Sequence, residues 1–515
     1  MKYKILITTS GIGSRLGNLT DYTNKCLVRI SNKPAISHII ESYPLGSQYV
    51  ITLGHYGDLV RQFLTLTYPE HDFTFVEIDN YKGEKSSLGY SILQAKKHLD
   101  CPFIFNACDT ILSDNTAILK ALDSGANFCM GDVREDVSQY ATLLTSGDKT
   151  LEIKRKGEMN YDYAYIGICG IKDHSLFFDL LEQTYNSNPY DSSLHEGRII
   201  NKMIKSHEFD FIRTYSWLDI GNVGELEKTR KHFKPEADVL EKREESIYFF
   251  KNSVVKFFNN AEICNNRVQR GKALFPLVPQ ILGQTENFYK YEKVEGTIFS
   301  SCVTDNKFRE LLSWSKNNLW TKKTLDNFNE MCYNFYITKT KNRIMKFLED
   351  NDDPAIINGK HLEPIESMMN KIDKEWLCNG QPVAFHGDFI LDNILKTKDG
   401  FCLLDWRQDF AGDLTTGDIY YDLSKLNHNL IVNHEILNKK LYSETPDNCH
   451  ILCNSSLLSC KQILKDFVQK NGYDYKKVET LTCLIWLNMA PLHEYPLNKF
   501  LFNFGKLNLA RILEQ

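Results

Sequence analysis

The chain has 515 residues, of which 42% are hydrophobic and 25% are charged, and its formal net charge is −5. This length exceeds the size at which one hydrophobic core usually stops growing, so we expect two or three domains. The composition excludes collagen-like and largely disordered proteins. The slightly acidic charge argues against a nucleic-acid partner, because a phosphate-binding surface needs an excess of Lys and Arg.

The sequence predicts neither a membrane segment nor a disulfide framework. A short apolar run at the N-terminus passes at once into a Gly-rich turn, which leaves no hydrophobic region for a signal peptide. No stretch reaches the ~20 apolar residues of a spanning helix. The fourteen cysteines are scattered, and the closest approach to a cluster is Cys449 with Cys453. We therefore expect a cytoplasmic protein with reduced core cysteines and small-molecule substrates; its oligomeric state is left open.

The first ~235 residues alternate short apolar runs with amphipathic stretches, a pattern typical of an α/β domain. The predicted strands are Lys4–Thr8, Tyr49–Leu53, Phe73–Glu77 and Pro102–Asn106, and the predicted helices are Pro34–Tyr43, Asp58–Leu66 and Ser87–Leu99. We expect a Rossmann-like, mostly parallel sheet with helices on both faces.

A charged stretch, Glu227–Glu245, is predicted to be a solvated helix that marks a domain boundary. The predicted domains are 1–235 and 246–515. In the second domain Ser246–Phe258 and Phe288–Glu295 are predicted to form strands, 300–375 helices, 383–405 two further strands, and the remainder helices. We expect an α+β fold for this half.

The segment Leu6–Thr20, LITTSGIGSRLGNLT, places a Gly-rich turn directly after the first predicted strand. Such a turn lets backbone N–H groups approach a phosphate closely. Arg15 and, ten residues later, Lys25 add two cations to the same connection. The cluster suits a nucleoside triphosphate attacked at its α-phosphorus. A tight turn with solvent-facing cations is the alternative.

The order Gly-x-Gly-x-Arg, Thr, Lys-x-Leu and Lys-Pro across Gly11–Pro34 resembles the sugar and amino-alcohol nucleotidyltransferase family. The resemblance implies that the nucleotide phosphates are held by Gly11, Gly13, Ser14 and Arg15. It further implies that Lys25 contacts phosphate during transfer, so that Arg15 and Lys25 are catalytic. The base-reading loop matches Gly83–Gly89 only loosely, which leaves CTP and UTP both open as the second nucleotide.

Two carboxylates extend this resemblance. Asp109 follows the predicted strand that ends at Asn106, and Asp219 lies in the segment Trp217–Asn222. Ligands bind outside the carboxyl ends of parallel strands, although a single Asp is more often a cap or turn residue. As a pair they resemble the family's Mg²⁺ ligands, whose metal would stabilise the transition state as a substrate phosphate displaces pyrophosphate.

The strongest motif is Phe385–Leu395, FHGDFILDNIL, followed by FCLLDWR at Phe401–Arg407. It resembles the aminoglycoside phosphotransferase and choline kinase family, a branch of the protein-kinase-like fold. The resemblance implies that Asp388 is the base that accepts the proton of an attacking hydroxyl. Asn393 and Asp405 would hold Mg²⁺ at ATP.

Neighbouring segments fit the same family. Lys256, on the predicted strand Ser253–Phe258, stands where the kinase strand lysine contacts the ATP phosphates. Glu262 is either its ion-pair partner or a solvated side chain. Gly417–Ser424 resembles the segment that braces the catalytic loop. The absence of a GxGxxG loop before Lys256 weakens a protein-kinase interpretation more than a small-molecule one.

Together the two predicted domains form a coherent pair: a kinase phosphorylates a small hydroxylated substrate, and a nucleotidyltransferase couples that phosphate to CTP or UTP. By resemblance, the product is a precursor for cell-surface polysaccharide. We favour a sugar, because Asp219–Asn222 resembles the sugar-type members. The alternatives are a choline or ethanolamine kinase with a cytidylyltransferase, or one degenerate regulatory domain.

The aromatic residues of the second half would form either a cation–π cage for choline or ordinary core: Trp314, Trp320, Tyr333, Phe335, Trp376, Trp406 and Trp486.

Overall fold

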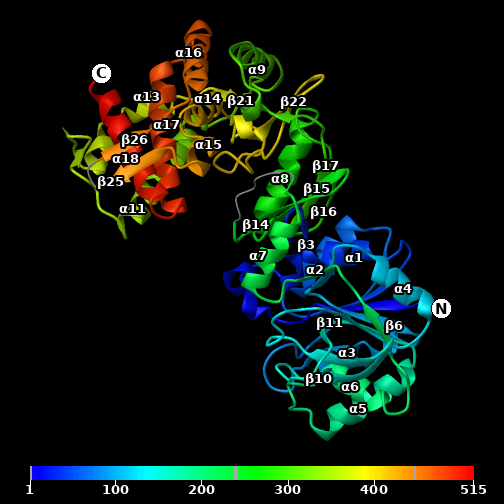
Figure 1. The fold of residues 1–515 in the computed structure, drawn as a ribbon. Coiled ribbons are helices and arrows are strands. Elements are labelled where there is room, and N and C mark those ends of the chain that lie inside the picture. The colour runs from blue at the N-terminus through cyan, green and yellow to red at the C-terminus, as the bar shows by residue number, and fades with distance from the viewer. Residues whose placement is uncertain (1–2, 236–241, 446–447) are drawn as a thin grey trace. The chain divides into compact units, whose positions relative to one another are not determined.

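The computed structural model describes residues 3–235, 242–445 and 448–515 (Figure 1). It divides into two compact units, Met1–Ala261 with Leu282–Tyr291, and Glu262–Ile281 with Glu292–Gln515. The ranges 1–235 and 246–515 are boundaries of predicted enzyme domains rather than of compact units, and they stay a prediction. Among the described helices, none combines the length and apolar character needed to cross a bilayer.

A nine-stranded mixed sheet forms the centre of the first unit. Its strands, in spatial order, are β5 (Asp72–Glu77), β4 (Gln48–Leu53), β1 (Lys4–Thr8), β6 (Phe103–Ala107), β11 (Tyr163–Ile171), β8 (Phe128–Asp132), β12 (Asp210–Arg213), β10 (Lys149–Lys154) and β9 (Thr142–Ser146). The strands from β5 to β6 are parallel, as expected. Beyond them the sheet is mixed, because β9 and β10 form a short antiparallel hairpin and β11 runs antiparallel to β6 and β8.

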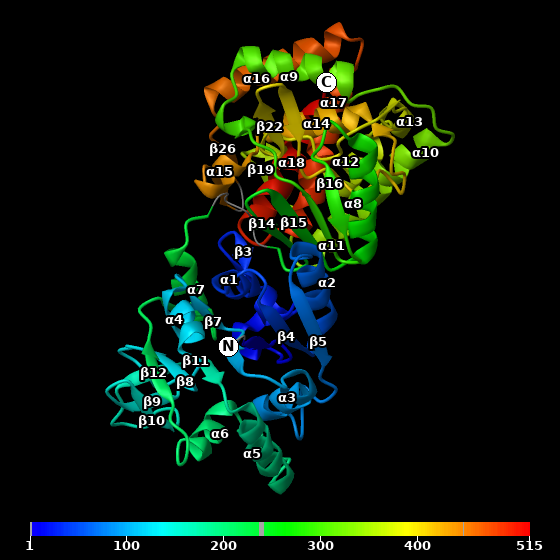
Figure 2. The same ribbon diagram turned by 90° about the vertical axis from the view of Figure 1, so that its right-hand side faces the viewer.

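Helices cover both faces of this sheet (Figures 1 and 2). One side carries α1 (Ala35–Ser42), α2 (Gly57–Thr67) and α4 (Thr116–Ser124), and the other carries α3 (Leu88–Gln94), α5 (His174–Ser187) and α6 (Glu196–Met203). Along β1, Ile5 and Ile7 enter one hydrophobic cluster and Leu6 enters the other. Both faces of the strand are therefore buried, which explains its continuous apolar sequence.

The charged stretch differs from its prediction. Helix α7 (Val223–His232) ends at His232, and the strand β14 (Glu245–Phe249) begins at Glu245. Residues 236–241 of the predicted helix lie outside the described residues. The helix stops early because the backbone at Phe233 is already extended, with ψ of 136°.

A four-stranded sheet follows in the order β14, β15 (Ser253–Phe258), β17 (Phe288–Glu292) and β16 (Ile281–Gln284). The predicted strand Ser246–Phe258 is thus an antiparallel hairpin. Tyr248, Phe257 and Phe288 of this sheet join the first unit's hydrophobic core together with Phe63. The Tyr248 hydroxyl also donates to the carbonyl of Leu27 at 2.8 Å. Core packing therefore places these strands in the first unit.

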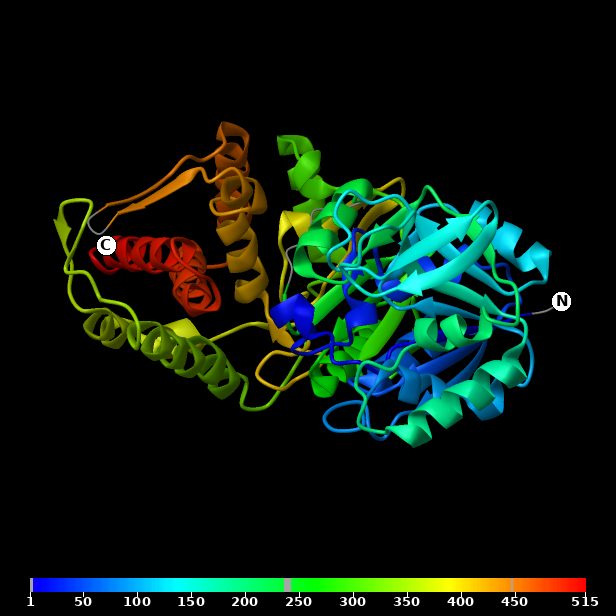
Figure 3. The ribbon, with the colours of Figure 1, turned by 60° about the horizontal axis from the view of Figure 1, so that its bottom comes forward.

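The second unit is mainly helical, and the antiparallel strands β22 (Ile394–Thr397) and β23 (Gly400–Leu403) confirm the pair predicted within 383–405. Figure 3 shows α17, near the red end of the colour scale, beside the yellow-green α11. The helices are α8 (Ala261–Leu274), α9 (Asp305–Asn318), α10 (Phe328–Tyr333), a π-helix (Asn334–Thr338), α11 (Lys339–Leu348), α12 (Ile365–Lys371), α13 (Lys374–Cys378), α14 (Ile419–Asn429), α15 (His434–Asn438), α16 (Ser455–Lys470), α17 (Tyr475–Met489) and α18 (Leu497–Leu513). The short strands are β18 (Thr297–Ile298), β19 (Ile356–Ile357), β20 (Lys360–His361), β21 (Pro382–Val383), β24 (Gly417–Asp418), β25 (Tyr442–Thr445) and β26 (Asn448–Ile451). All fourteen cysteines lie in the described ranges as free thiols.

Candidate active sites

The Gly-rich turn follows β1 and carries the first group of predicted site residues. Gly13 has a φ of 74°, and a Cβ there would lie 2.9 Å from the Cβ of Lys25. Only glycine fits this position, because both the backbone conformation and the approach of Lys25 exclude a side chain. Gly11 has open space around its Cα. The Asn24 side-chain amide donates to the Thr9 carbonyl at 2.8 Å and so fixes the segment that carries Lys25.

Asp109 lies just beyond the carboxyl end of β6, which pairs in parallel with β1 and so meets the Gly turn at one sheet edge. Its Oδ2 accepts a hydrogen bond from Lys25 Nζ at 2.5 Å and lies 3.9 Å from Arg15 Nη2. Burial alone would raise the pKa of Asp109, but the two cations outweigh it and hold that pKa below its usual value. Ser14 and Arg15 open the 3₁₀ helix Ser14–Thr20.

A two-stranded ribbon brings Asp219 to the same place. In it, β13 (Trp217–Asp219) pairs with β7 (Thr110–Leu112). A Cβ at Gly221 would lie 3.1 Å from Asp219 Oδ1 and 3.6 Å from Asp109 Oδ2, so both carboxylates border one spot. Burial, followed by the charge of Asp109, raises the pKa of Asp219.

Two carboxylates that converge beside a phosphate-binding turn fit Mg²⁺, because this ion prefers oxygen ligands and is often shared with a substrate's phosphates. Within the described ranges no cluster of three or more His, Cys, Asp or Glu side chains is arranged for a metal. The Tyr140 hydroxyl donates to Asp219 Oδ2 at 2.7 Å. Sequence reasoning missed Tyr140, since no motif marks it and only folding brings it to Asp219.

In the second unit, Asp388 lies in the loop that leads to β22. Lys425 Nζ lies 2.7 Å from Asp388 Oδ1, and Asn393 Nδ2 donates to the carbonyl and to Oδ2 of Asp388 at 3.0 and 3.1 Å. Burial would raise the pKa of Asp388, but Lys425 outweighs it and keeps the carboxylate ionised. The Asn393 amide nitrogen is used in this way, so its oxygen is the atom suited to a metal. Lys425, on α14, was not predicted from the sequence.

His386 is a structural member of this loop. Its Nε2 lies 2.8 Å from the carbonyl of Leu404, and the backbone N–H of Asp388 points to its Nδ1 at 3.3 Å. Burial lowers the pKa of His386 to about 4, so the ring is neutral at physiological pH and carries its proton on Nε2. The ring thus ties Asp388 to the segment before Asp405.

Asp422 of α14 braces the same loop from below, as the Gly417–Ser424 resemblance implied. It accepts hydrogen bonds from the backbone of His386 at 2.8 Å and Gly387 at 2.7 Å, and from Trp320 Nε1 at 3.0 Å. Burial raises the pKa of Asp422 to about 6. Two backbone donors of the His386–Asp388 loop and the Trp320 indole thus meet at one buried carboxyl group, which fixes the loop.

Asp405 adopts a left-handed backbone conformation, with φ of 54°. Such strain costs about 1–3 kcal/mol and is found mostly at functional sites. Arg267 of α8 pairs with its carboxylate and also donates to the Trp406 carbonyl at 2.7 Å. The negative charge of Asp405 acts to raise the pKa of Asp388, and the side-chain oxygens of Asp405 and Asn393 are of the kind that Mg²⁺ prefers.

Lys256 lies on β15 in the first unit, opposite Ile247 of β14, and its side chain is buried. The role of Lys256 at ATP stays a prediction.

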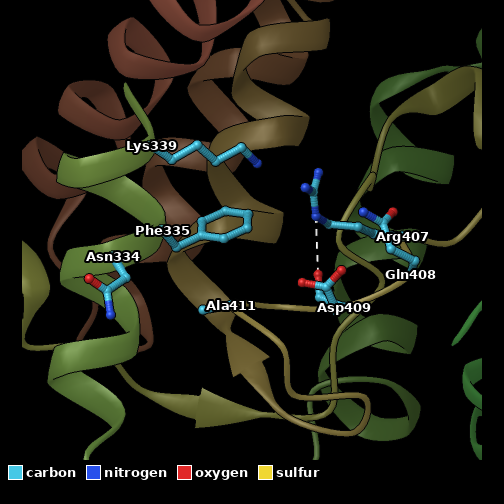
Figure 4. A pocket seen from close by; sticks show the side chains of 7 residues that line it. All are labelled: Asn334, Phe335, Lys339, Arg407, Gln408, Asp409 and Ala411. Atoms are coloured by element: carbon cyan, nitrogen blue, oxygen red, sulfur yellow. Dashed lines mark hydrogen bonds between the residues drawn. The ribbon is translucent and has the colours of Figure 1, made fainter. Parts of the chain in front are cut away.

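Three of the aromatic residues belong to the core of the second unit, and a fourth, Phe335, lines a cavity. Trp320, Trp406 and Trp486 are buried, and their indole N–H groups donate to Asp422, to the Arg267 carbonyl and to a histidine, respectively. They pack the core. A cavity of about 260 Å³ in this unit is lined by Asn334, Phe335, Lys339, Arg407, Gln408, Asp409 and Ala411 (Figure 4).

Comparisons with known proteins divide the chain in the same way. Residues 338–433 match the phosphotransferase enzyme family. This range includes the His386 loop, Asp405 and the bracing helix α14. The N-terminal region is similar to nucleotidyltransferases. The similarities thus concern nucleotidyltransferases in the N-terminal region and phosphotransferases in residues 338–433.

Among curated relatives, GlmU of Campylobacter lari, a bifunctional protein, is 21% identical over 53% of this chain and 65% of its own length. GlmU of Methanocaldococcus jannaschii is 25% identical over 47% and 57%. The chain thus spans less than two thirds of either. The UTP–glucose-1-phosphate uridylyltransferase AglF of Haloferax volcanii is 23% identical over 45% of this chain and 97% of its own. Among solved structures, the CTP:phosphocholine cytidylyltransferase of Streptococcus pneumoniae is 21% identical, with 45% of this chain and all of that one covered and a TM-score of 0.40.

Proposed function

We propose that the chain is a bifunctional cytoplasmic enzyme that makes a nucleotide-activated precursor for cell-surface polysaccharide. The phosphotransferase part phosphorylates a small hydroxylated substrate, in our favoured version a sugar, with ATP. The nucleotidyltransferase part then couples that phosphate to CTP or UTP and releases pyrophosphate. The main support is that each unit pairs a predicted site carboxylate with a cation: Lys25 with Asp109, and Lys425 with Asp388.

In the phosphotransferase reaction the Asp388 carboxylate accepts the proton of the acceptor hydroxyl. The charge of Lys425 keeps this carboxylate ionised beforehand. Asn393 and Asp405 would hold a magnesium ion that neutralises the ATP phosphates, and the predicted phosphate contact of Lys256 is carried over as part of the proposal. The braced loop fixes the position of Asp388 before the acceptor arrives.

In the nucleotidyltransferase reaction the turn Gly11–Arg15 holds the triphosphate, and Lys25 approaches the α-phosphate. Asp109 and Asp219 would hold the magnesium ion. At both sites Mg²⁺, when bound, would supply charge neutralisation of the phosphates.

Separate assays on the full chain test the two reactions. ADP release is followed with ATP, Mg²⁺ and sugars, with choline and ethanolamine as the alternative acceptors. Pyrophosphate release is followed with CTP or UTP and a supplied sugar phosphate or phosphocholine. Asp388→Asn should abolish the first activity only, and Asp109→Asn the second only. Loss of both activities in either variant, or ADP release that survives Asp388→Asn, would refute these assignments.

A further inference from the structure

The cavity of about 260 Å³ in the second unit is lined by two cationic side chains, Lys339 and Arg407, and by one carboxylate, Asp409. Figure 4 shows the Lys339 amine and the Arg407 guanidinium pointing toward one another above the Phe335 ring. Lys339 Nζ lies 4.4 Å and the Arg407 guanidinium carbon 5.0 Å from the centre of that ring. Two cations from separate segments thus contact the same aromatic ring.

Within the described ranges, the Lys339 amine and the Arg407 guanidinium contact an aromatic ring and a backbone carbonyl rather than a carboxylate. Arg407 Nε donates to the Asp409 carbonyl at 3.1 Å, and a third cation, Arg343, donates to the carbonyl of Asn488 at 3.0 Å. The Asp409 carboxylate also lines the cavity and accepts the N–H of Gly412 at 3.1 Å.

This crowding is electrostatically unfavourable without an anion. Burial, followed by the charges of Arg407 and Arg343, lowers the pKa of Lys339 to about 6, and Asp409 offsets this only in part. A bound anion would relieve the repulsion and restore the charge on Lys339. Cationic side chains that shift one another's pKa within a cavity are typical of a ligand-binding site.

The cavity adjoins the catalytic loop. The Arg407 backbone N–H donates to the His386 carbonyl at 3.0 Å, and a Cβ at Gly387 would lie 2.6 Å from the Arg407 Cβ. The positive charge of Lys425, which pairs with Asp388, also acts on Lys339. A molecule in this cavity would therefore lie close to the predicted base.

We propose that the acceptor carries an anionic group, a carboxylate or a phosphate ester, which Lys339 and Arg407 bind while its hydroxyl is directed to Asp388. This inference rests on the proposed phosphotransferase function and names its substrate class. The hydroxyl oxygen forms a bond to the γ-phosphorus of ATP, and the bond from that phosphorus to the β–γ bridging oxygen breaks. ADP departs, and the hydroxyl proton passes to the Asp388 carboxylate.

The test uses acceptors that share a skeleton: glucose, glucuronate and glucose 6-phosphate, and glycerol, glycerate and glycerol 3-phosphate, with choline as the cation. ADP release is measured for the wild type, Lys339→Met and Arg407→Gln. Lys346→Met is the matched control, because Lys346 lies exposed on the same helix. We expect kcat/KM for one anionic series to exceed that of its neutral partner about tenfold or more. The first two variants should raise KM for anionic acceptors only, and the carboxylate and phosphate arms identify the group.

A second measurement does not need activity. Lys339 is labelled with an amine-reactive reagent at neutral pH and quantified by mass spectrometry, with and without each acceptor. Protection by anionic acceptors alone supports the anion site, even if no acceptor releases ADP and the proposed kinase function fails. Equal or better turnover of neutral acceptors or choline would overturn the inference, as would the absence of selective protection.

Discussion

The two candidate sites place similar charge pairs in different surroundings. Beside the Gly turn, Asp109 lies next to two cations, the largely buried Lys25 and the half-exposed Arg15. In the second unit, Asp388 pairs with one cation, Lys425, and accepts a hydrogen bond from Asn393, while the buried Asp422 holds its loop. In the first site, a second cation remains if one is removed. In the second site, buried hydrogen bonds to Asp422 fix the loop that carries the carboxylate. Substitutions should affect chemistry in the first site more than stability, and both in the second.

The largest effect is expected from Asp422→Ala. It leaves the N–H groups of His386 and Gly387 and the indole of Trp320 without their acceptor. Each buried donor left unsatisfied costs about 1–3 kcal/mol, so we expect the free energy of unfolding of the second unit to fall by about 4 kcal/mol. Urea unfolding measures this, with the exposed Asp466→Ala as control. Equal midpoints for the two variants would contradict the bracing role.

A pH series sharpens the same point. The folded-state pKa of Asp422 is raised from 3.8 to about 6, so the folded chain binds an extra proton between those values. The contribution of Asp422 to stability is thus fully present below the lower value and is lost as the pH rises through about 6, by on the order of 3 kcal/mol. Asn cannot titrate. The wild type should therefore lose stability relative to Asp422→Asn across this window, and a constant difference in urea midpoints would refute the shift.

Lys425→Met isolates the pair of Lys425 and Asp388. It leaves the partly exposed Asp388 carboxylate without its cation, which should cost about 1–2 kcal/mol of unfolding free energy after allowance for solvent screening. In the double variant with Asp388→Asn the loss should be smaller than the sum of the single losses, because the pair is removed together. Denaturant unfolding of the four proteins gives the coupling. Additive losses would show that the two side chains do not interact in solution.

Lys25→Met tests the first site. Because Arg15 remains 3.9 Å from Asp109, we expect a stability loss of only about 1 kcal/mol. Pyrophosphate release should nevertheless fall about 100-fold or more, since the lost cation acts on the phosphate under attack. ADP release by the same preparation serves as the internal control. If both activities fell together, the two sites would not be independent.

The smallest effect is expected from Tyr140→Phe. Removing one hydrogen bond to Asp219 should cost about 1 kcal/mol in stability. The hydroxyl lowers the pKa of Asp219, so its removal should raise that pKa further. Thermal unfolding at several pH values checks both effects, with the exposed Tyr215→Phe as control. A loss as large as that of Lys25→Met in pyrophosphate release would give Tyr140 a more direct role.

Local patterns in the sequence were sufficient where one segment carries its own signal. The strand Lys4–Thr8 is apolar throughout because both faces are buried, and it was predicted with its observed bounds. The Gly turn and the His386–Asn393 loop were visible as spacings of a few residues. Ser246–Phe258 was predicted as a strand, although its turn makes it a hairpin, because an apolar run does not reveal where the chain reverses.

The sequence by itself determined the two halves of the chain, the Gly turn with Lys25, and the loop that carries Asp388 and Asn393. Only the tertiary structure brought Lys425 to Asp388, Arg267 to Asp405, Tyr140 to Asp219, and Lys339 to Arg407 across one cavity. These partners lie far apart in the chain and follow no fixed spacing. Burial decides the first three pairs, because a buried carboxylate is stable only beside a cation or hydrogen-bond donor that folding supplies. The two cations Lys339 and Arg407 meet instead because separate segments line the same cavity.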